Sequence, residues 1–361
     1  MRLPIRLLFA TPMLLALAAC GERAPITIGT VLGSEGQTGA QLAVDELNES
    51  GGVGGRRVAL RVVEGGASTS AAPALAAAEA LSADPTIIAV VGHSNSSASL
   101  SASQIYNARR LVHIAPTSSS PMLTIAGPYT FRLVGSDIHQ ARFLASAALS
   151  GPGPHRIAAI YVNDDYGHAL NRELRSELAN RGVELAYQAR YVEGRDIPYP
   201  DKMISGMVSA GVTHLLWLGR SSQLTAVMER LRVEIPALRV IASDGAQNGT
   251  ALRNLDGALT GVRVVSFLSS DTPNATLALL HKRFFAMSDQ PLTSDVVLAY
   301  DAVHLIASAV REVGPNRERI RQYLAGVGSQ RPTHRGASGD IGFDVNGDPR
   351  ATYRLLEIAA P

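Results

Sequence analysis

The sequence contains a single cysteine, Cys20, among its 361 residues. One thiol excludes an internal disulfide, and it also excludes the paired C-x-x-C spacing of structural zinc sites. The H-E-x-x-H spacing of zinc proteases is absent as well. We therefore expect neither a metal nor a cofactor.

Strong charge of one sign is also absent. The formal net charge is +2, and charged residues make up 18% of the chain. This balance argues against a nucleic-acid partner and against a charged disordered tail. The 46% hydrophobic content is enough for two domains with full cores.

Long apolar runs are missing after the N-terminus. There, Arg2 and Arg6 precede an apolar run from Leu7 to Leu17 that is too short to span a bilayer and has the layout of a secretory signal. The run leads into Leu-Ala-Ala-Cys-Gly, which resembles the bacterial lipoprotein box and implies a diacylglycerol on Cys20. The alternative is an ordinary cleaved signal with an incidental cysteine. We expect a water-soluble body in the periplasm, anchored to a membrane by acyl chains.

Apolar runs alternate with helical patterns from Ile26 onward. The first strand-like runs are "ITIGTVL", "RRVALRVVE", "PTIIAVVG" and "RRLVHIAP", and the alternation restarts after the Gly-Pro-Gly-Pro stretch at 151–154. This order predicts an α/β fold of two doubly wound parallel-sheet lobes. Near the C-terminus, "IGFDVNGDPRATYRLLEI" predicts a hairpin around an Asn-Gly turn.

Two clusters of hydroxyl residues follow predicted strands, at Ser94–Ser97 and at Thr117–Ser120. Ligands of open parallel sheets collect beyond the carboxyl ends of the strands. We expect Ser96 or Ser97 to cap the following helix, whose free amides and dipole favour a carboxylate. The alternative is simple capping by solvated serines.

A hydrolase is the enzymatic alternative. The stretch "GHSNS", Gly92 to Ser96, is similar to the G-x-S-x-G elbow of serine hydrolases, with Ser94 or Ser96 as nucleophile. Its fifth position is serine rather than glycine, which crowds the sharp turn that the elbow needs. We therefore expect a binding protein and not an enzyme.

Several stretches together resemble one known family. They are "GAQLAVDELNESGGVGGRRVALRVVE", "AVVGHSNSSASLSASQIYNARRLVHIAPTSSSPMLT" and "YTFRLVGSDIHQA", extended by "VNDDYGHAL", "LAYDAV" and "FDVNGD". These resemble the leucine/isoleucine/valine-binding proteins, the type I periplasmic solute-binding proteins of ABC transporters. The resemblance covers nearly the whole chain after Pro25.

The resemblance implies two lobes joined by a hinge that close on an amino acid. We expect a signal peptide at 1–20, a first lobe from 25–140 plus 269–352, and a second from 141–268 plus 353–361. It also implies an ABC permease as partner and a monomer. The alternative function on this fold is a ligand-sensing receptor or a lipoprotein that regulates cell-wall synthesis.

The resemblance also assigns ligand contacts. The hydroxyls of Ser96 and Ser119 would hold the ligand carboxylate, with main-chain groups of Thr117. Asp244, in "ASDG", would pair with the α-ammonium, and Tyr166 would contribute an aromatic contact. Each has a simpler alternative: turn residues at Ser119 and Asp244, and a surface aromatic at Tyr166.

Two departures from the family affect the ligand. The loop "GTVLGSEGQTGA" is short and lacks the usual lid aromatic, and "WLGRSS" places Arg220 and Ser221 where amino-acid binders often carry Gly and Tyr. We therefore expect an amino acid or a related small carboxylate or amide. Arg220 would favour a polar or acidic ligand side chain, unless it is only a solvated loop charge.

Overall fold

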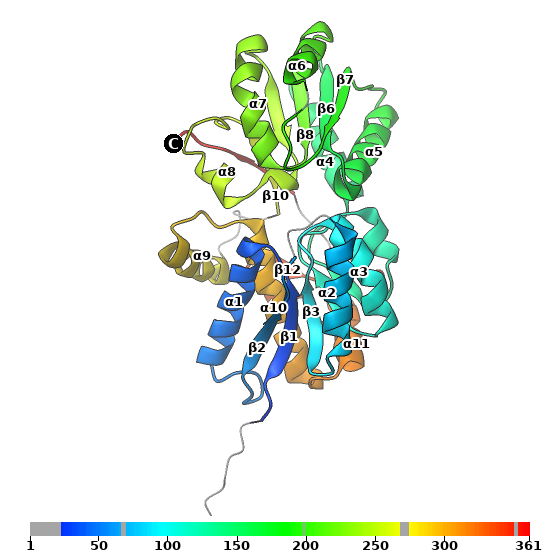
Figure 1. Cartoon of the computed structure of the whole chain (residues 1–361), viewed down its shortest axis with the longest axis vertical. Helices are drawn as coiled ribbons and strands as arrows, with labels where there is room; N and C mark the ends of the chain where they lie inside the picture. The colour runs from blue at the N-terminus through cyan, green and yellow to red at the C-terminus, as the bar shows by residue number, and fades with distance from the viewer. Residues whose placement is uncertain (1–22, 66–69, 198, 268–273, 350–352) are drawn as a thin grey trace, which may run out of the picture.

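The computed structural model describes residues 23–65, 70–197, 199–267, 274–349 and 353–361, which form two lobes along the long axis of the molecule (Figure 1). The predicted signal segment and Cys20 lie outside the described residues. Within these ranges, no helix combines the length and the apolar character needed to cross a membrane.

The first lobe is built on a parallel sheet with the strand order β2-β1-β3-β4-β5. Its strands are the apolar runs that the alternation predicts: β1 (Ile26–Val31), β2 (Val58–Val62), β3 (Ile87–Gly92), β4 (Val112–Ala115) and β5 (Thr130–Arg132). The order reverses between β1 and β3, so polar loops at their carboxyl ends meet at one switch point.

Helices cover both faces of this sheet. Their bounds are α1 (Ser34–Glu49), α2 (Ala71–Ala83), α3 (Ser96–Ala108), α9 (Ala275–Ser288), α10 (Ser294–Val313) and α11 (Arg317–Gly326), with a 3-10 turn η1 (Pro121–Ile125). Ile88 and Val91 of β3 join the core cluster that contains α1 and α10, whereas Ile87 and Val90 join the cluster with α2 and α3. β3 therefore packs against both helix layers and is buried along its whole length.

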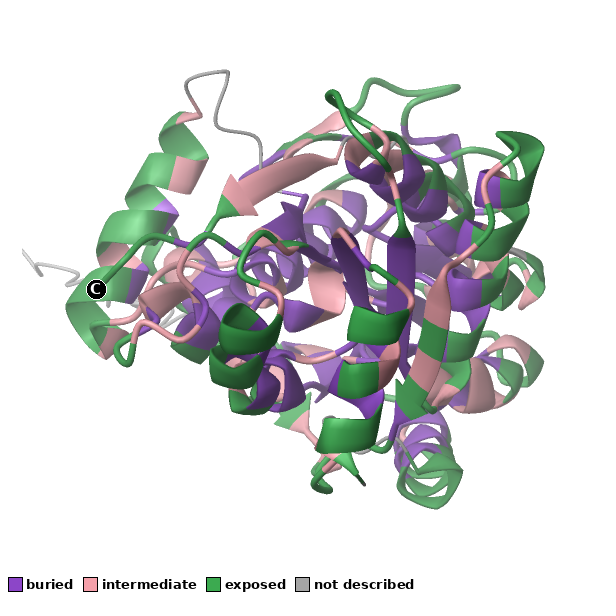
Figure 2. Ribbon diagram, turned by 90° about the horizontal axis from the view of Figure 1, so that it is seen from above, coloured by how far each residue is buried: buried purple, intermediate pink, exposed green. Residues whose placement is uncertain are grey.

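The second lobe has the order β13-β10-β9-β8-β6-β7, and β13 alone runs antiparallel to its neighbour within the described sheet. The strands are β6 (Ile157–Val162), β7 (Tyr187–Tyr191), β8 (His214–Leu218), β9 (Arg239–Ala242), β10 (Arg263–Ser266) and β13 (Arg354–Glu357). The covering elements are α4 (Asp137–Ala148), α5 (Asp165–Asn180), α6 (Pro200–Ser209), α7 (Ser221–Glu234), η2 (Asp244–Ala246) and α8 (Gly249–Arg253). One hydrophobic cluster fills this lobe, and the helices keep their outward faces exposed (Figure 2).

The expected C-terminal hairpin is wrong. Among the described residues, the turn at Asn346 and Gly347 closes a local bridge between Phe343 and Pro349, whereas β13 pairs with β10. Leu355 and Leu356 of β13 pack against the core of the second lobe. The edge of β10 thus pairs with β13, a segment for which the Asn-Gly turn predicted a local hairpin. A separate short hairpin joins β11 (His334–Gly336) and β12 (Gly339–Ile341).

Helices α1 and α10 approach so closely that a methyl group does not fit at Gly39. A Cβ built there would lie 2.1 Å from the carbonyl oxygen of Val296. We expect Gly39→Ala to lower the free energy of unfolding by about 1–3 kcal/mol, measured by urea denaturation. Gly36→Ala in the same helix is the matched control, because the nearest atom to its Cβ would be in the Leu32 side chain, at 3.4 Å. Equal stabilities of the two variants would contradict the close approach.

Candidate functional site

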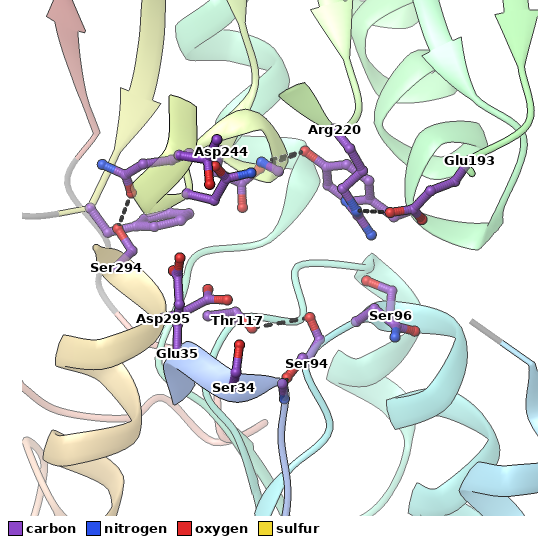
Figure 3. A pocket seen from close by; sticks show the side chains of 18 residues that line it. Ser34, Glu35, Ser94, Ser96, Thr117, Glu193, Arg220, Asp244, Ser294 and Asp295 are labelled. Carbon is purple, nitrogen blue, oxygen red and sulfur yellow. Dashed lines mark hydrogen bonds and ion pairs between the residues drawn. The ribbon is translucent and has the colours of Figure 1, made fainter. Parts of the chain in front are cut away.

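A cavity of about 450 Å³ opens between the lobes, where the carboxyl ends of both sheets face each other (Figure 3). Its size is within the usual range for small-molecule sites. The residues that line it come from both lobes: Gly33, Ser34, Glu35, Ser94, Asn95, Ser96, Thr117, Tyr166, Glu193, Arg220, Asp244, Gly245, Gln247, Asn248, Thr250, Phe267, Ser294 and Asp295.

Hydroxyl groups from the two predicted clusters meet on the first-lobe wall. The Ser94 hydroxyl accepts a hydrogen bond from the Gly33 amide at 2.8 Å, which ties the loops after β1 and β3 together. The Thr117 hydroxyl donates to the Ser94 carbonyl at 3.3 Å, and the Ser96 hydroxyl accepts from the Ser120 amide at 3.2 Å. These bonds hold the two clusters as one surface.

The residue that caps α3 is Asn95, so the expectation of a serine cap at Ser96 or Ser97 is wrong. The Asn95 side-chain oxygen accepts from the Ala98 amide at 2.9 Å, and its extended backbone suits a cap. Ser96 is already the first helical residue. The start of α3, with the amides that have no partner inside the helix, therefore lies at the cavity wall beside the Ser96 hydroxyl.

Asp244 lies on the opposite wall, two residues after the end of β9. Its carboxylate accepts hydrogen bonds from the Tyr166 hydroxyl at 2.6 Å and from the Gln140 side-chain amide at 2.8 Å. Burial raises the pKa of Asp244, and these two donors oppose that rise. Tyr166 is buried at the start of α5, so its hydroxyl orients Asp244 toward the cavity. Neutral donors leave the negative charge of the carboxylate available to a ligand cation.

Arg220 reaches the cavity but is already paired with carboxylates. Its guanidinium lies 3.4 Å from Glu193 and 3.8 Å from Asp164, and it stacks 5.2 Å from the centre of the Tyr166 ring. Because two protein carboxylates compensate the cation, Arg220 gives no reason to expect an acidic ligand side chain.

Three of the predicted contacts do not line the cavity. Ser119 is fully buried behind it, where its carbonyl accepts from Arg132. The Ser221 hydroxyl accepts from the side-chain amide of Asn248, which itself lines the cavity, so Ser221 orients a neighbour. Ser97 is the second residue of α3, one position beyond the residue that faces the cavity.

The sequence patterns did not point to Glu35 and Asp295. Both lie in the first turn of a first-lobe helix, Glu35 in α1 and Asp295 in α10, and both line the cavity. Glu35 accepts a hydrogen bond from the second-lobe amide of Gly249 at 2.9 Å and one from the Thr293 hydroxyl at 2.7 Å. Carboxylates in a first helical turn are common, so only the fold distinguishes these two from surface charges.

Asp295 should make the stability of the ligand-free protein depend on pH. Burial and the nearby charge of Glu35 raise its pKa to about 7; Asp244 adds to the rise, and Arg220 opposes it. Between about pH 4, where an unfolded aspartate ionises, and about pH 7, the native state binds the extra proton, so its stability falls as pH rises. We expect the melting temperature of Asp295→Asn, taken relative to that of the wild type, to increase as pH rises through this window. An equal difference in melting temperature at both ends of the window would contradict the raised pKa of Asp295.

The serines of "GHSNS" do not form a hydrolase centre. No histidine is among the described residues that line the cavity. His93 is buried, and its ring contacts the Tyr106 hydroxyl instead of Ser94 or Ser96. The Ser94 hydroxyl is held by a backbone amide, as described above.

Comparisons with known proteins agree with this arrangement. The model of the periplasmic binding protein family matches residues 28–360. The Leu/Ile/Val-binding protein homolog 1 of Brucella suis is 26% identical over 322 residues, which cover 89% of this chain and 84% of the relative.

Two solved structures share the two-lobed fold. The isoleucine complex of the branched-chain amino acid substrate-binding protein LivJ from Streptococcus pneumoniae superposes with a TM-score of 0.83 at 20% identity, over 93% of this chain and 96% of that one. A leucine complex of a substrate-binding protein from Desulfitobacterium hafniense gives 0.75 at 25% identity, over 94% and 99%. Proteins of this family bind solutes outside the cytoplasm and are not enzymes. The chain belongs to the periplasmic binding protein family, with the two-lobed fold of its type I members.

Proposed function

We propose that this protein captures an amino acid, or a related small carboxylate or amide, between its lobes and delivers it to an ABC permease. The observation that carries the proposal is the chemical asymmetry of the cavity. One wall offers the Ser96 hydroxyl and the start of α3, and the other offers the Asp244 carboxylate. A zwitterion presents the matching charges, and both contacts strengthen when closure removes water.

The remaining predicted contacts belong to the same proposal. Thr117 would support the carboxylate from the first lobe, and Tyr166 would act mainly through its hydrogen bond to Asp244. The proteins named above are a Leu/Ile/Val-binding protein homologue and two substrate-binding proteins with bound isoleucine and bound leucine, and this supports the amino-acid class. The cavity contains Arg220 and three carboxylates besides Asp244, so we do not extend the branched aliphatic ligand to this chain.

Closure would move two bodies, the lobes 25–140 plus 269–352 and 141–268 plus 353–361. Strand membership supports these boundaries, because β13 joins the second sheet after the chain has completed the first lobe. The Gly249–Glu35 hydrogen bond, already formed in this structure, would help to hold the lobes together, since its donor and acceptor come from different lobes. We propose that the protein acts as a monomer.

Thermal shift and calorimetry against the twenty amino acids and common amides test the function. A ligand at 100 times its dissociation constant should stabilise the folded protein by about 2.7 kcal/mol. Binding of one such compound with a one-to-one stoichiometry is expected. If none of the panel binds, transport of amino acids is excluded and the cell-wall-regulating lipoprotein becomes the better explanation of the fold.

We also propose that Cys20 carries the lipid anchor. In bacteria that express the full chain, labelled palmitate should be incorporated and the protein should sediment with membranes. Cys20→Ser should abolish both results while leaving ligand binding intact. A wild-type protein that is exported but unlabelled would favour the ordinary cleaved signal.

A further inference from the structure

The cavity contains more negative charge than a neutral amino acid can compensate. Its lining includes four carboxylates, Glu35, Glu193, Asp244 and Asp295, and one guanidinium, Arg220. Arg220 pairs with Glu193 and with Asp164 outside the cavity. The other three lining carboxylates form no ion pair with any described residue.

One of these carboxylates, Asp244, is assigned above to the α-ammonium of the ligand. Two then remain, Glu35 and Asp295, and they lie together on the first-lobe wall, away from Ser96 (Figure 3). Their proximity is also reflected in the effect of Glu35 on the ionisation of Asp295. A pair of like charges in a partly buried site is unfavourable unless one carboxylate keeps a proton or a cation joins the pair.

Helix α10 contains a second aspartate, Asp301, whose hydrogen bonds can be compared with those of Asp295. Asp301, fully buried in the same helix, accepts hydrogen bonds from the Ala337 amide at 2.6 Å and from the Ser338 amide and hydroxyl at 2.8 and 2.6 Å. Asp295 is half-buried at the cavity wall and accepts no hydrogen bond from any residue in the described ranges. The Asp295 carboxylate therefore faces the cavity without a donor from the described chain, and a cation in the cavity can reach it.

We propose that the cavity is specific for an amino acid with a positively charged side chain, whose distal cation binds between Glu35 and Asp295. This rests on the proposed function, since the α-carboxylate and α-ammonium keep the contacts given there. Glu35 contributes charge and also bonds the Gly249 amide of the other lobe. This hydrogen bond links the cation subsite to the second lobe.

Calorimetry with lysine, arginine and norleucine tests this specificity, because norleucine has nearly the length of lysine without its side-chain charge. We expect lysine or arginine to bind at least tenfold more tightly than norleucine. Asp295→Asn should remove most of this preference for lysine or arginine. Its dissociation constant for norleucine should stay within about threefold of the wild-type value. The control is Asp289→Asn, an exposed aspartate of the same lobe that changes the net charge equally. It should leave the preference unchanged.

The outcomes separate the two proposals. Tight binding of norleucine or leucine, with no gain from a side-chain cation, would overturn the inference and leave the proposed function standing. Absence of binding by every amino acid would overturn both. Cadaverine, which is lysine without its carboxylate, should bind at least tenfold more weakly than lysine. Stronger binding of cadaverine would identify a diamine site and overturn the amino-acid assignment.

Discussion

Replacement of Asp244 by asparagine is expected to weaken the binding of any α-amino acid by about 2–4 kcal/mol, roughly 30- to 1000-fold in the dissociation constant. The substitution keeps the shape of the side chain and its contacts with Tyr166 and Gln140. It removes the negative charge that would face the ligand ammonium, so a buried cation is left unpaired. Calorimetry on the purified body measures the change.

Asp256→Asn is the matched control for this experiment. Asp256 is an exposed aspartate of the second lobe and does not line the cavity. Its replacement should leave affinity unchanged. If Asp244→Asn behaves in the same way, the ammonium binds elsewhere or the ligand has none. A loss of affinity in both variants would indicate a long-range effect of net charge instead of a contact.

The second large effect is expected at Arg132, whose replacement by methionine should cost about 3–5 kcal/mol of unfolding free energy. The Arg132 side chain is 1% exposed and pairs with Asp348 at 2.6 Å. It also donates to the carbonyls of Ser119 and Ser120, at 3.1 and 2.9 Å. Methionine keeps much of the volume but leaves a largely buried carboxylate and two carbonyls without their donor. Urea denaturation measures the loss.

An exposed arginine provides the control for Arg132. Arg142 lies 3.8 Å from Glu177 with 61% of its side chain exposed, so Arg142→Met should change stability by less than about 1 kcal/mol. Because Arg132 supports the loop that carries Thr117, we also expect weaker ligand binding in Arg132→Met. Similar stabilities of the two variants would show that the buried pair contributes little.

The fold was predictable from the sequence because its signals are local. Continuous apolar runs such as "TIIAVVG" identify strands that are buried on both faces, and the alternation with helices dictates parallel sheets. The C-terminal hairpin failed for a physical reason. Asn346 and Gly347 do form a turn, but the pairing of β13 is decided by the exposed edge of β10, which is distant in sequence.

The candidate site was predictable only in part. Ser96, Thr117 and Asp244 each follow a strand, and all three line the cavity. Because ligands bind at the carboxyl ends of parallel strands, their positions in the sequence were enough to predict a shared site. Ser119 and Ser97 belong to the same two hydroxyl clusters but do not line the cavity. The direction of a loop side chain depends on backbone angles that composition does not specify.

The sequence by itself therefore determined the two doubly wound lobes, the edge at which ligands collect, and the family to which the chain is similar. Only the tertiary structure decided the charge of the cavity. Glu35 and Asp295 are separated by 260 positions in the sequence, and each is an ordinary acidic residue at a helix start. Their proximity arises because α1 and α10 pack against each other, and electrostatic interaction depends on distance in space and on burial, not on separation along the chain.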